Sequence, residues 1–365
     1  MSRIAGGGVL LFVGTRRGLF RFRSDDDRRS WRCDSFEIAG HDIYHATVEA
    51  STGVGYAAAS HPVWGAHIYR TDDFGGTWNA CGGRPRFPAD LDREVRAVWH
   101  LAQGRAPNGD DRVYAGVEPA GLYHSDDRGT TWTFNAGLDR HPTRGSWQPA
   151  KGGLALHSIQ TCASTPDRLF VALSAGGCYR TDDGGLTWLA INSGVRADFL
   201  PDSLPESGQC VHSLRLHPTD PARLYQQNHC GTYRSDDGGD SWVEITAGLP
   251  SDFGYVVGLD PADPHRCWVI PEDSSHLRSV CDQRLRVFET QDAGACWTSR
   301  IDGLPQEQVW ATVMREALAT DGADPCGVYF GTGTGHLFAS RDGSAWNVLA
   351  DHLPKILSVE ACRIG

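Results

Sequence analysis

Three similar segments of the sequence begin with histidine. They read His-Ala-Thr-Val-Glu from His45, His-Ser-Ile-Gln-Thr from His157 and His-Ser-Leu-Arg-Leu from His212. The alternation of apolar and polar residues indicates that each segment is a short strand. Neutral imidazoles that converge from different strands are common ligands of transition metals in proteins. One hypothesis is therefore that these three histidines, together with His229, bind a divalent transition metal (Zn, Mn or Fe).

Candidate catalytic groups lie in segments that the sequence predicts to be connections. Glu118 lies in Val-Glu-Pro-Ala-Gly beside an apolar segment, and His61 and His229 lie in short connections that end in glycine. Carboxylates and imidazoles are the usual acids and bases of enzymes, so we expect these three residues to transfer protons. Arg144 and Lys151 belong to a long connection between residues 139 and 153, and would neutralise an anionic substrate.

Two other interpretations of the histidines stay open. Without a metal, they would serve as acids, bases or hydrogen-bond donors to a substrate. Alternatively, they hydrogen-bond water or one another in a wet part of the fold and have no chemical role. The remaining histidines, among them His100 and His217, are predicted to be ordinary surface or turn residues.

An internal repeat predicts the elements that position these groups. Four segments share a hydroxyl residue, two aspartates, a glycine and a closing Trp: residues 71–78, 125–132, 181–188 and 235–242. Segments 24–31, 290–297 and 340–346 are degraded copies, and the tryptophans that end the seven segments lie about 50 residues apart, which suits one four-stranded blade per repeat. In each copy, we expect the second Asp to accept hydrogen bonds within a hairpin turn and Gly to supply a positive φ.

These segments resemble the Asp-box, or BNR, repeat of sialidases, sortilin-type propellers and related proteins. Seven copies in phase imply an all-β fold, a seven-bladed β-propeller with four antiparallel strands per blade, in a single domain of residues 1–365. The resemblance also implies a sialidase-like glycosyl hydrolase, in which three arginines would bind the carboxylate of the substrate. The Arg-Ile-Pro motif near the start of those sialidases is absent here, because Gly18 follows Arg16 and Arg17.

The two ends of the chain are expected to share one blade. Residues 10–36 would supply three strands, and residues 355–361 an inner strand without partners of its own. Closing the ring in this way leaves no open sheet edge. The connections between blades, and those between second and third strands, emerge at one end of such a ring. We therefore expect the functional site at this loop-rich mouth of the central channel.

Composition narrows the class of protein. The chain has 34 Lys and Arg against 45 Asp and Glu, a net charge of −11, which disfavours a nucleic-acid partner. No apolar run is long enough to cross a bilayer, so no membrane association is expected. Eleven cysteines without CxxC pairs favour a reducing compartment, and hence a cytoplasmic location. No P-loop or dinucleotide fingerprint occurs, so no organic cofactor is expected, and the sequence does not indicate an oligomeric state.

Three functions are compatible with these observations. The first is a hydrolase or lyase that acts on a small polar or anionic substrate at a His-rich, metal-binding site. The second is a sialidase-like exo-glycosidase with a saccharide substrate. The third is a non-catalytic propeller that binds or assembles other molecules, since one propeller scaffold hosts unrelated activities.

Overall fold

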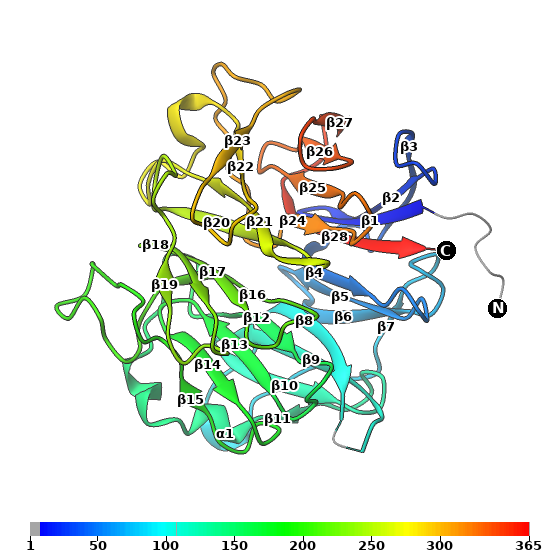
Figure 1. The fold of residues 1–365 in the computed structure, drawn as a ribbon. Helices are drawn as coiled ribbons and strands as arrows, with labels where there is room; N and C mark the ends of the chain where they lie inside the picture. The colour runs from blue at the N-terminus through cyan, green and yellow to red at the C-terminus, as the bar shows by residue number, and fades with distance from the viewer. Residues whose placement is uncertain (1–7, 107, 365) are drawn as a thin grey trace.

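A computed structural model describes residues 8–106 and 108–364, which form seven four-stranded antiparallel sheets arranged around a central axis (Figure 1). The predicted seven-bladed β-propeller is therefore confirmed. Blade 1 contains β28 (Ile356–Ile364), β1 (Gly8–Thr15), β2 (Gly18–Ser24) and β3 (Trp31–Glu37). Blade 2 contains β4 (Asp42–Val48), β5 (Gly55–His61), β6 (Gly65–Thr71) and β7 (Asn79–Ala80). Blade 3 contains β8 (Ala97–Arg105), β9 (Asp111–Glu118), β10 (Gly121–Ser125) and β11 (Thr133–Phe134).

The other four blades follow the same order from the channel outward. Blade 4 contains β12 (Leu156–Thr161), β13 (Leu169–Leu173), β14 (Gly177–Thr181) and β15 (Leu189–Ala190). Blade 5 contains β16 (Val211–Leu216), β17 (Leu224–Asn228), β18 (Gly231–Ser235) and β19 (Val243–Glu244). Blade 6 contains β20 (Gly254–Asp260), β21 (Asp263–Pro271), β22 (Val287–Thr290) and β23 (Thr298–Arg300). Blade 7 contains β24 (Leu318–Thr320), β25 (Val328–Gly331), β26 (Leu337–Ser340) and β27 (Asn347–Ala350).

Short helices occupy the connections. α1 (Ala136–Asp139) and a 3-10 turn (Pro142–Ser146) lie between blades 3 and 4. Two further 3-10 turns, Ala89–Leu91 and Cys281–Gln283, precede β8 and β22. Among the residues that the structure places, no helix is long and apolar enough to span a membrane.

Blade 1 closes the ring as the sequence predicts. β28 pairs antiparallel with β1, with Leu10 opposite Cys362 and Val13 opposite Val359. The pairing brings the blue N-terminal strand and the red C-terminal strand side by side in Figure 1. Because the last strand completes the first blade, β1 is paired on both sides, with β28 and with β2.

Each well-preserved repeat folds into a hairpin turn held by its own side chains. In blade 4, Thr181 donates from Oγ1 to Asp183 Oδ1 at 2.7 Å, and the same carboxylate accepts from the backbone N–H of Thr187 at 2.9 Å. Gly185 takes a φ of 94°, which a residue with a side chain rarely adopts. The tryptophan that ends a repeat can also bind the neighbouring blade. In blade 5, Trp242 donates from Nε1 to the carbonyl of Ile191 in blade 4 at 2.7 Å.

In the degraded first repeat, a buried ion pair joins blade 1 to blade 7. Arg28, which replaces a glycine of the pattern, donates from Nη1 to Asp321 Oδ2 of blade 7 at 2.8 Å and to the carbonyl of Pro325 at 2.9 Å. The two charged side chains are 6% and 0% exposed. Tyr329 donates to the same carboxylate at 2.7 Å. This buried ion pair fixes blade 1 against blade 7.

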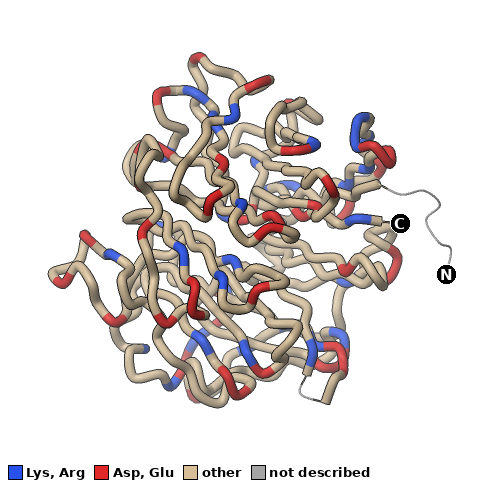
Figure 2. The backbone as a smooth tube through the Cα atoms, viewed as in Figure 1, with Lys and Arg blue, Asp and Glu red and all other residues tan. Residues whose placement is uncertain are grey.

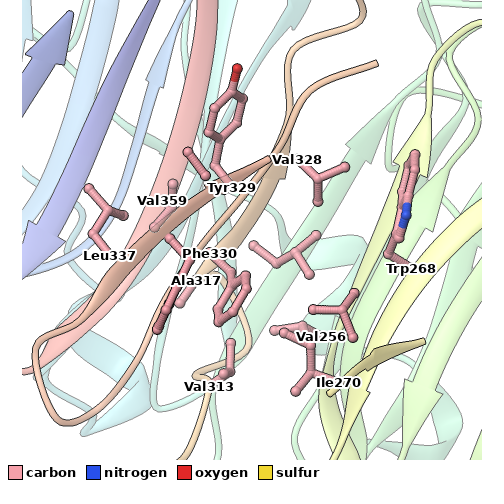
Figure 3. Close-up of a cluster of buried hydrophobic side chains, with 14 of the residues drawn as sticks. Val256, Trp268, Ile270, Val313, Ala317, Val328, Tyr329, Phe330, Leu337 and Val359 are labelled. Carbon is pink, nitrogen blue, oxygen red and sulfur yellow. The ribbon is translucent and has the colours of Figure 1, made fainter. Parts of the chain in front are cut away.

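The hydrophobic core lies between the blades. Figure 3 shows its largest cluster, in which Trp268 and Ile270 of blade 6 face Val328 and Phe330 of blade 7, with Val359 of β28 beside them. Alternating residues of each strand point into such interfaces, so every blade buries both faces against its neighbours. In the view of Figure 2, acidic and basic residues are interspersed along the chain rather than gathered by sign. All eleven cysteines of the sequence lie in the described part of the chain and are free thiols.

Candidate functional site in the central channel

The inner strands carry a β-bulge at one equivalent position, and this bulge determines which histidines are equivalent. In β12 and β16 the bulged residues are His157 and His212, as the change of register around each shows. In β4 and β8 the same position holds Tyr44 and Trp99. His45 therefore lies one residue further along its strand, and its predicted equivalence to His157 and His212 is wrong. The extra residue of a bulge is difficult to place in a single sequence, and a shift of one residue changes the direction of a side chain.

His45 belongs to a second layer deeper in the channel. Its ring stacks on that of His100, with centroids 4.0 Å apart. Its Nε2 lies 3.8 Å from Oε2 of Glu316, and His100 Nδ1 lies 3.5 Å from Oε1 of the same carboxylate. His100 is 3% exposed, so its prediction as a surface or turn residue is wrong. His217 was predicted in the same way, but it is 1% exposed and hydrogen-bonds the carbonyl of Asp260 at 3.0 Å.

Glu316 is the centre of this deeper layer. It precedes β24 and is held by backbone contacts to β28, where the N–H of Val359 donates to its carbonyl at 2.8 Å. From blade 5, Arg215 donates from Nη2 to Glu316 Oε2 at 2.9 Å. Its other oxygen, Oε1, is buried and makes no regular hydrogen bond within the described structure. Burial opposes ionisation of Glu316, but Arg215, His100 and His45 hold its pKa well below the usual range.

A second carboxylate, Glu360 of β28, lies in the same cavity and behaves in the opposite way. Burial raises the pKa of Glu360 to about 8, Glu316 adds to the rise, and Arg215 opposes it. At neutral pH one carboxyl group is therefore ionised and the other carries a proton. Two carboxyl groups whose surroundings drive their pKa values apart are the arrangement that acid–base enzymes use. We call His45, His100, Arg215, Glu316 and Glu360 the channel cluster.

The channel cluster lines a cavity of about 780 Å3. The cavity continues past Gln160 and Thr320 to the turns at Ala163, Pro218 and Pro261, which join the first and second strands of blades 4, 5 and 6. In an up-and-down sheet these turns lie at the same end as the turns between third and fourth strands. The cavity thus opens on the end that carries the Ser/Thr-Asp turns, whereas the site was predicted at the opposite, loop-rich mouth.

Two of the predicted metal ligands do meet near the loop-rich mouth. Cys210, His212 and His229 each present one ligand atom, and these atoms lie within 4.8 Å of one another. Cys210 Sγ lies 3.6 Å from His212 Nε2. We call these three residues the upper cluster. The four predicted ligands are therefore divided: His212 and His229 lie here, and His45 lies in the channel cluster.

His157 belongs to neither cluster. It is fully buried, its Nε2 donates to the carbonyl of Val211 at 2.9 Å, and its Nδ1 lies 3.1 Å from Ser158 Oγ. Both ring nitrogens are therefore used within the protein, and the ring acts as a bridge between blades 4 and 5.

The other predicted catalytic residues lie apart from both clusters. Glu118 accepts from Trp99 Nε1 at 3.1 Å and stays half-buried near the loop-rich mouth. His61 accepts at Nδ1 from the backbone N–H groups of Val63 and Trp64, which fixes a surface turn.

The two residues predicted to bind an anion, Arg144 and Lys151, also lie outside both clusters. Arg144 is bound to Asp139 at 3.2 Å and lies over the ring of Trp147. Lys151 is exposed. The structure thus does not bring Glu118, His61, Arg144 and Lys151 together with His229 as one site.

Arg215, Glu316 and Glu360 were not predicted from the sequence as site residues. A charged residue in the middle of an inner strand could have indicated these residues, because the other residues of such strands are mostly apolar or small. Arg215 lies in His-Ser-Leu-Arg-Leu and Glu360 in Ser-Val-Glu-Ala, so both stand at positions that face the channel. That they meet could not be predicted, since their blades are far apart in sequence and only ring closure places them on one axis.

Comparison with known proteins supports the architecture. The scan against protein-family models found no match. The chain is 21% identical over 233 residues to a xyloglucanase of Hypocrea jecorina (strain QM6a), which covers 59% of this chain and 26% of that protein. This chain therefore spans about a quarter of the length of this relative.

Solved structures show the same fold. A GH74 enzyme of Niastella koreensis superposes with a TM-score of 0.61 at 17% identity, covering 94% of this chain and 55% of that one. The protein YCF48, solved bound to D1 peptide, superposes with a TM-score of 0.53 at 14% identity, covering 96% of this chain and 88% of that one. At these identities, the likeness to the solved structures demonstrates the propeller fold and leaves the function to be argued from the site.

Proposed function

We propose that this protein is a glycoside hydrolase that cleaves a small, polar saccharide in the channel cavity. The observation that carries the proposal is the pair of carboxyl groups, Glu316 and Glu360, on the wall of one open cavity. The sequence similarity to a xyloglucanase supports the same class of reaction. A glycoside hydrolase needs one carboxylic acid and one carboxylate on either side of the scissile bond.

The two groups have distinct roles. Glu360, whose raised pKa keeps it protonated at neutral pH, is the general acid that donates its proton to the leaving-group oxygen. Glu316 is the carboxylate that attacks the anomeric carbon directly or activates a water molecule. We assign this step to Oε1, which makes no regular hydrogen bond in the described structure, because Arg215 binds Oε2.

His45 and His100 hold Glu316 in place from the other side. Burial and the neighbouring His100 keep the pKa of His45 well below its usual value, so the ring is neutral. Its Nε2 lies 3.8 Å from Glu316 Oε2, which is close packing and not a hydrogen bond, and a neutral ring adds no charge beside the carboxylate. The ionised state of Glu316 therefore depends mainly on Arg215, and the two rings position it.

The cavity favours a compact substrate. Its volume, about 780 Å3, falls within the range of small-molecule sites. Amide and hydroxyl side chains such as Gln103, Gln160, Thr161 and Thr320 line it, which suits a polyhydroxylated ligand. Apart from imidazoles, the described lining contains no aromatic ring that would stack on a long polysaccharide.

The sialidase-like alternative finds less support in this cavity. Such an enzyme would need three arginines on the carboxylate of the substrate. Among the described lining residues, Arg215 is the one arginine, and it is bound to Glu316. A neutral saccharide therefore fits the cavity better than a sialic acid.

The proposal is tested by hydrolysis of a panel of para-nitrophenyl glycosides of neutral and acidic sugars. We expect turnover of at least one neutral member, and a loss of about 100-fold or more in kcat for Glu316→Gln, which keeps the shape and removes the charge. Glu307→Gln changes an exposed carboxylate and is the matched control. Equal turnover by Glu316→Gln and the wild type would overturn the assignment, and a folded protein without turnover on the whole panel would favour a non-catalytic binding propeller.

A further inference from the structure

The upper cluster lies at the opposite end of the channel from the proposed hydrolase site. Cys210 and His229 are neighbours across blade 5, because the N–H of His229 donates to the carbonyl of Cys210 at 3.0 Å, one step beyond the end of β17. His212 follows two residues after Cys210 on β16. One pair of adjacent strands thus presents a thiol and two imidazoles to a common point.

The tautomer of His212 is fixed in the form that a metal ligand needs. Nδ1 lies 2.6 Å from the carbonyl oxygen of Gly254 in blade 6. A carbonyl only accepts, so Nδ1 carries the proton and Nε2 carries a free lone pair. That lone pair faces Cys210 Sγ at 3.6 Å. A histidine whose second nitrogen donates to a backbone carbonyl is the usual arrangement around protein-bound metals.

The spacing of the donor atoms agrees with a tetrahedral ion. Bonds of about 2.0 Å to nitrogen and about 2.3 Å to sulfur place tetrahedral ligand atoms roughly 3.3–3.8 Å apart. The 3.6 Å between Cys210 Sγ and His212 Nε2 already lies in this range. All three donor atoms lie within 4.8 Å of one another, so a small rotation of the half-buried His229 ring completes the set.

Two of the three ligands are buried, and the third, His229, is the one nearest to solvent. Cys210 and His212 are 8% and 3% exposed, whereas His229 is half-buried. The ring of Phe253 lies 5.2 Å from both imidazoles. This packing restrains the buried His212 ring most, whereas the half-buried His229 ring keeps the freedom for the small rotation that completes the set.

We propose that Cys210, His212 and His229 form a binding site for a Zn²⁺-class transition metal, with three protein ligands and a fourth position open towards the loop-rich mouth. One thiolate and two imidazoles select a borderline-soft ion over Mg²⁺ or Ca²⁺, which need oxygen ligands. Three protein ligands with an open position are typical of zinc sites that bind water or a substrate.

The channel cluster is a poorer metal site, although His45, His100 and Glu316 also lie within 4.8 Å of one another. The guanidinium of Arg215 is already bound to that carboxylate at 2.9 Å, so a cation there would lie beside a fixed positive charge. In the upper cluster Arg315 and Arg278 also lie near Cys210 and His212, but no arginine of the described structure is hydrogen-bonded to the donor atoms of these two residues.

Cobalt is the probe that distinguishes the two clusters, because a thiolate bound to Co²⁺ gives a charge-transfer band in the near ultraviolet. The full-length protein, stripped with a chelator under reducing conditions, is titrated with Co²⁺. We expect one equivalent to bind with the charge-transfer band and with the visible bands of tetrahedral cobalt. Addition of Zn²⁺ should displace it.

Variants assign the ligands. Cys210→Ser should abolish the charge-transfer band, and His229→Gln should abolish stoichiometric binding while, at its half-buried position, leaving the fold intact by circular dichroism. Cys296→Ser changes an exposed thiol and should leave the titration unchanged. A band that survives in Cys210→Ser, an absence of binding, or cobalt that binds without a thiolate band and is lost in His45→Gln would each overturn the proposal.

Discussion

Arg215 of blade 5 and Glu316 of blade 7 form an ion pair across the central channel, with Nη2 and Oε2 2.9 Å apart. Their side chains are 20% and 4% exposed. Breaking a buried pair by removing one partner leaves the other charge without compensation, which costs more than the pair itself contributes. The pair therefore has two consequences, one for stability and one for the protonation of the channel cluster.

Replacement of Arg215 with Met should destabilise the protein by about 3 kcal/mol, because Glu316 would remain buried without its cation. Urea unfolding followed by tryptophan fluorescence measures the change. The double variant Arg215→Met with Glu316→Gln should recover part of the loss, because it no longer buries an unpaired charge.

A surface pair is the control for this prediction. Arg105 and Asp111 are bonded to each other but are 51% and 77% exposed. Arg105→Met should change the free energy of unfolding by less than about 1 kcal/mol. Equal effects of the two substitutions would show that the channel pair is not buried from water in solution.

The ring closure should depend on Arg28 in the same way. Arg28→Met leaves Asp321, whose side chain is 0% exposed, without its cation, and should cost about 3–5 kcal/mol. Arg29→Met, at the next and exposed position, is the matched control and should be close to neutral. Protease digestion of the folded protein should cut the Arg28→Met variant faster, because blade 1 would separate from blade 7 more often. Equal digestion of both variants would contradict this role of Arg28.

Glu360 should make stability fall as the pH rises. Its pKa is raised from 4.5 to about 8 in the folded protein, so the folded state binds the proton more tightly than the unfolded state does. The stabilisation is complete below about pH 4.5 and is lost as the pH rises through about 8. Glu360→Gln cannot ionise, so its melting temperature should decline less than that of the wild type over this interval. If the melting temperatures of the two proteins changed equally with pH, the pKa of Glu360 would not be raised in the folded state.

The fold follows from the sequence because its determinants are local. The turn of residues 181–188 needs its hydroxyl, carboxylate and glycines at fixed spacings, and repetition of that turn makes the signal unmistakable. For the same reason the three strands expected within residues 10–36 are observed there, as β1, β2 and β3. The shared blade could be predicted from strand count alone.

The channel cluster could not be predicted to the same degree. Its position depends on bulges that displace His45 relative to His212, and these bulges leave no clear mark in the sequence. Glu316 precedes β24 of blade 7 and Glu360 lies in β28 of blade 1. These two blades become neighbours only when the ring closes. The sequence placed His45, His157, His212 and His229 in one group, and of these only His212 and His229 lie together in the structure.

The proton-donating role of Glu360 is the central claim, and the dependence of hydrolysis on the leaving group tests it most directly. For a glycoside with a poor leaving group, such as a methyl glycoside of the sugar that is turned over, Glu360→Gln should lower kcat/KM by about 10²–10⁴-fold. For the para-nitrophenyl glycoside of the same sugar, which departs with little protonation, the loss should be about 10-fold or less. The wild-type activity on the poor leaving group should also decline as the pH rises through about 8. Equal losses on both substrates, or no loss on either, would contradict the assignment of Glu360 as the acid.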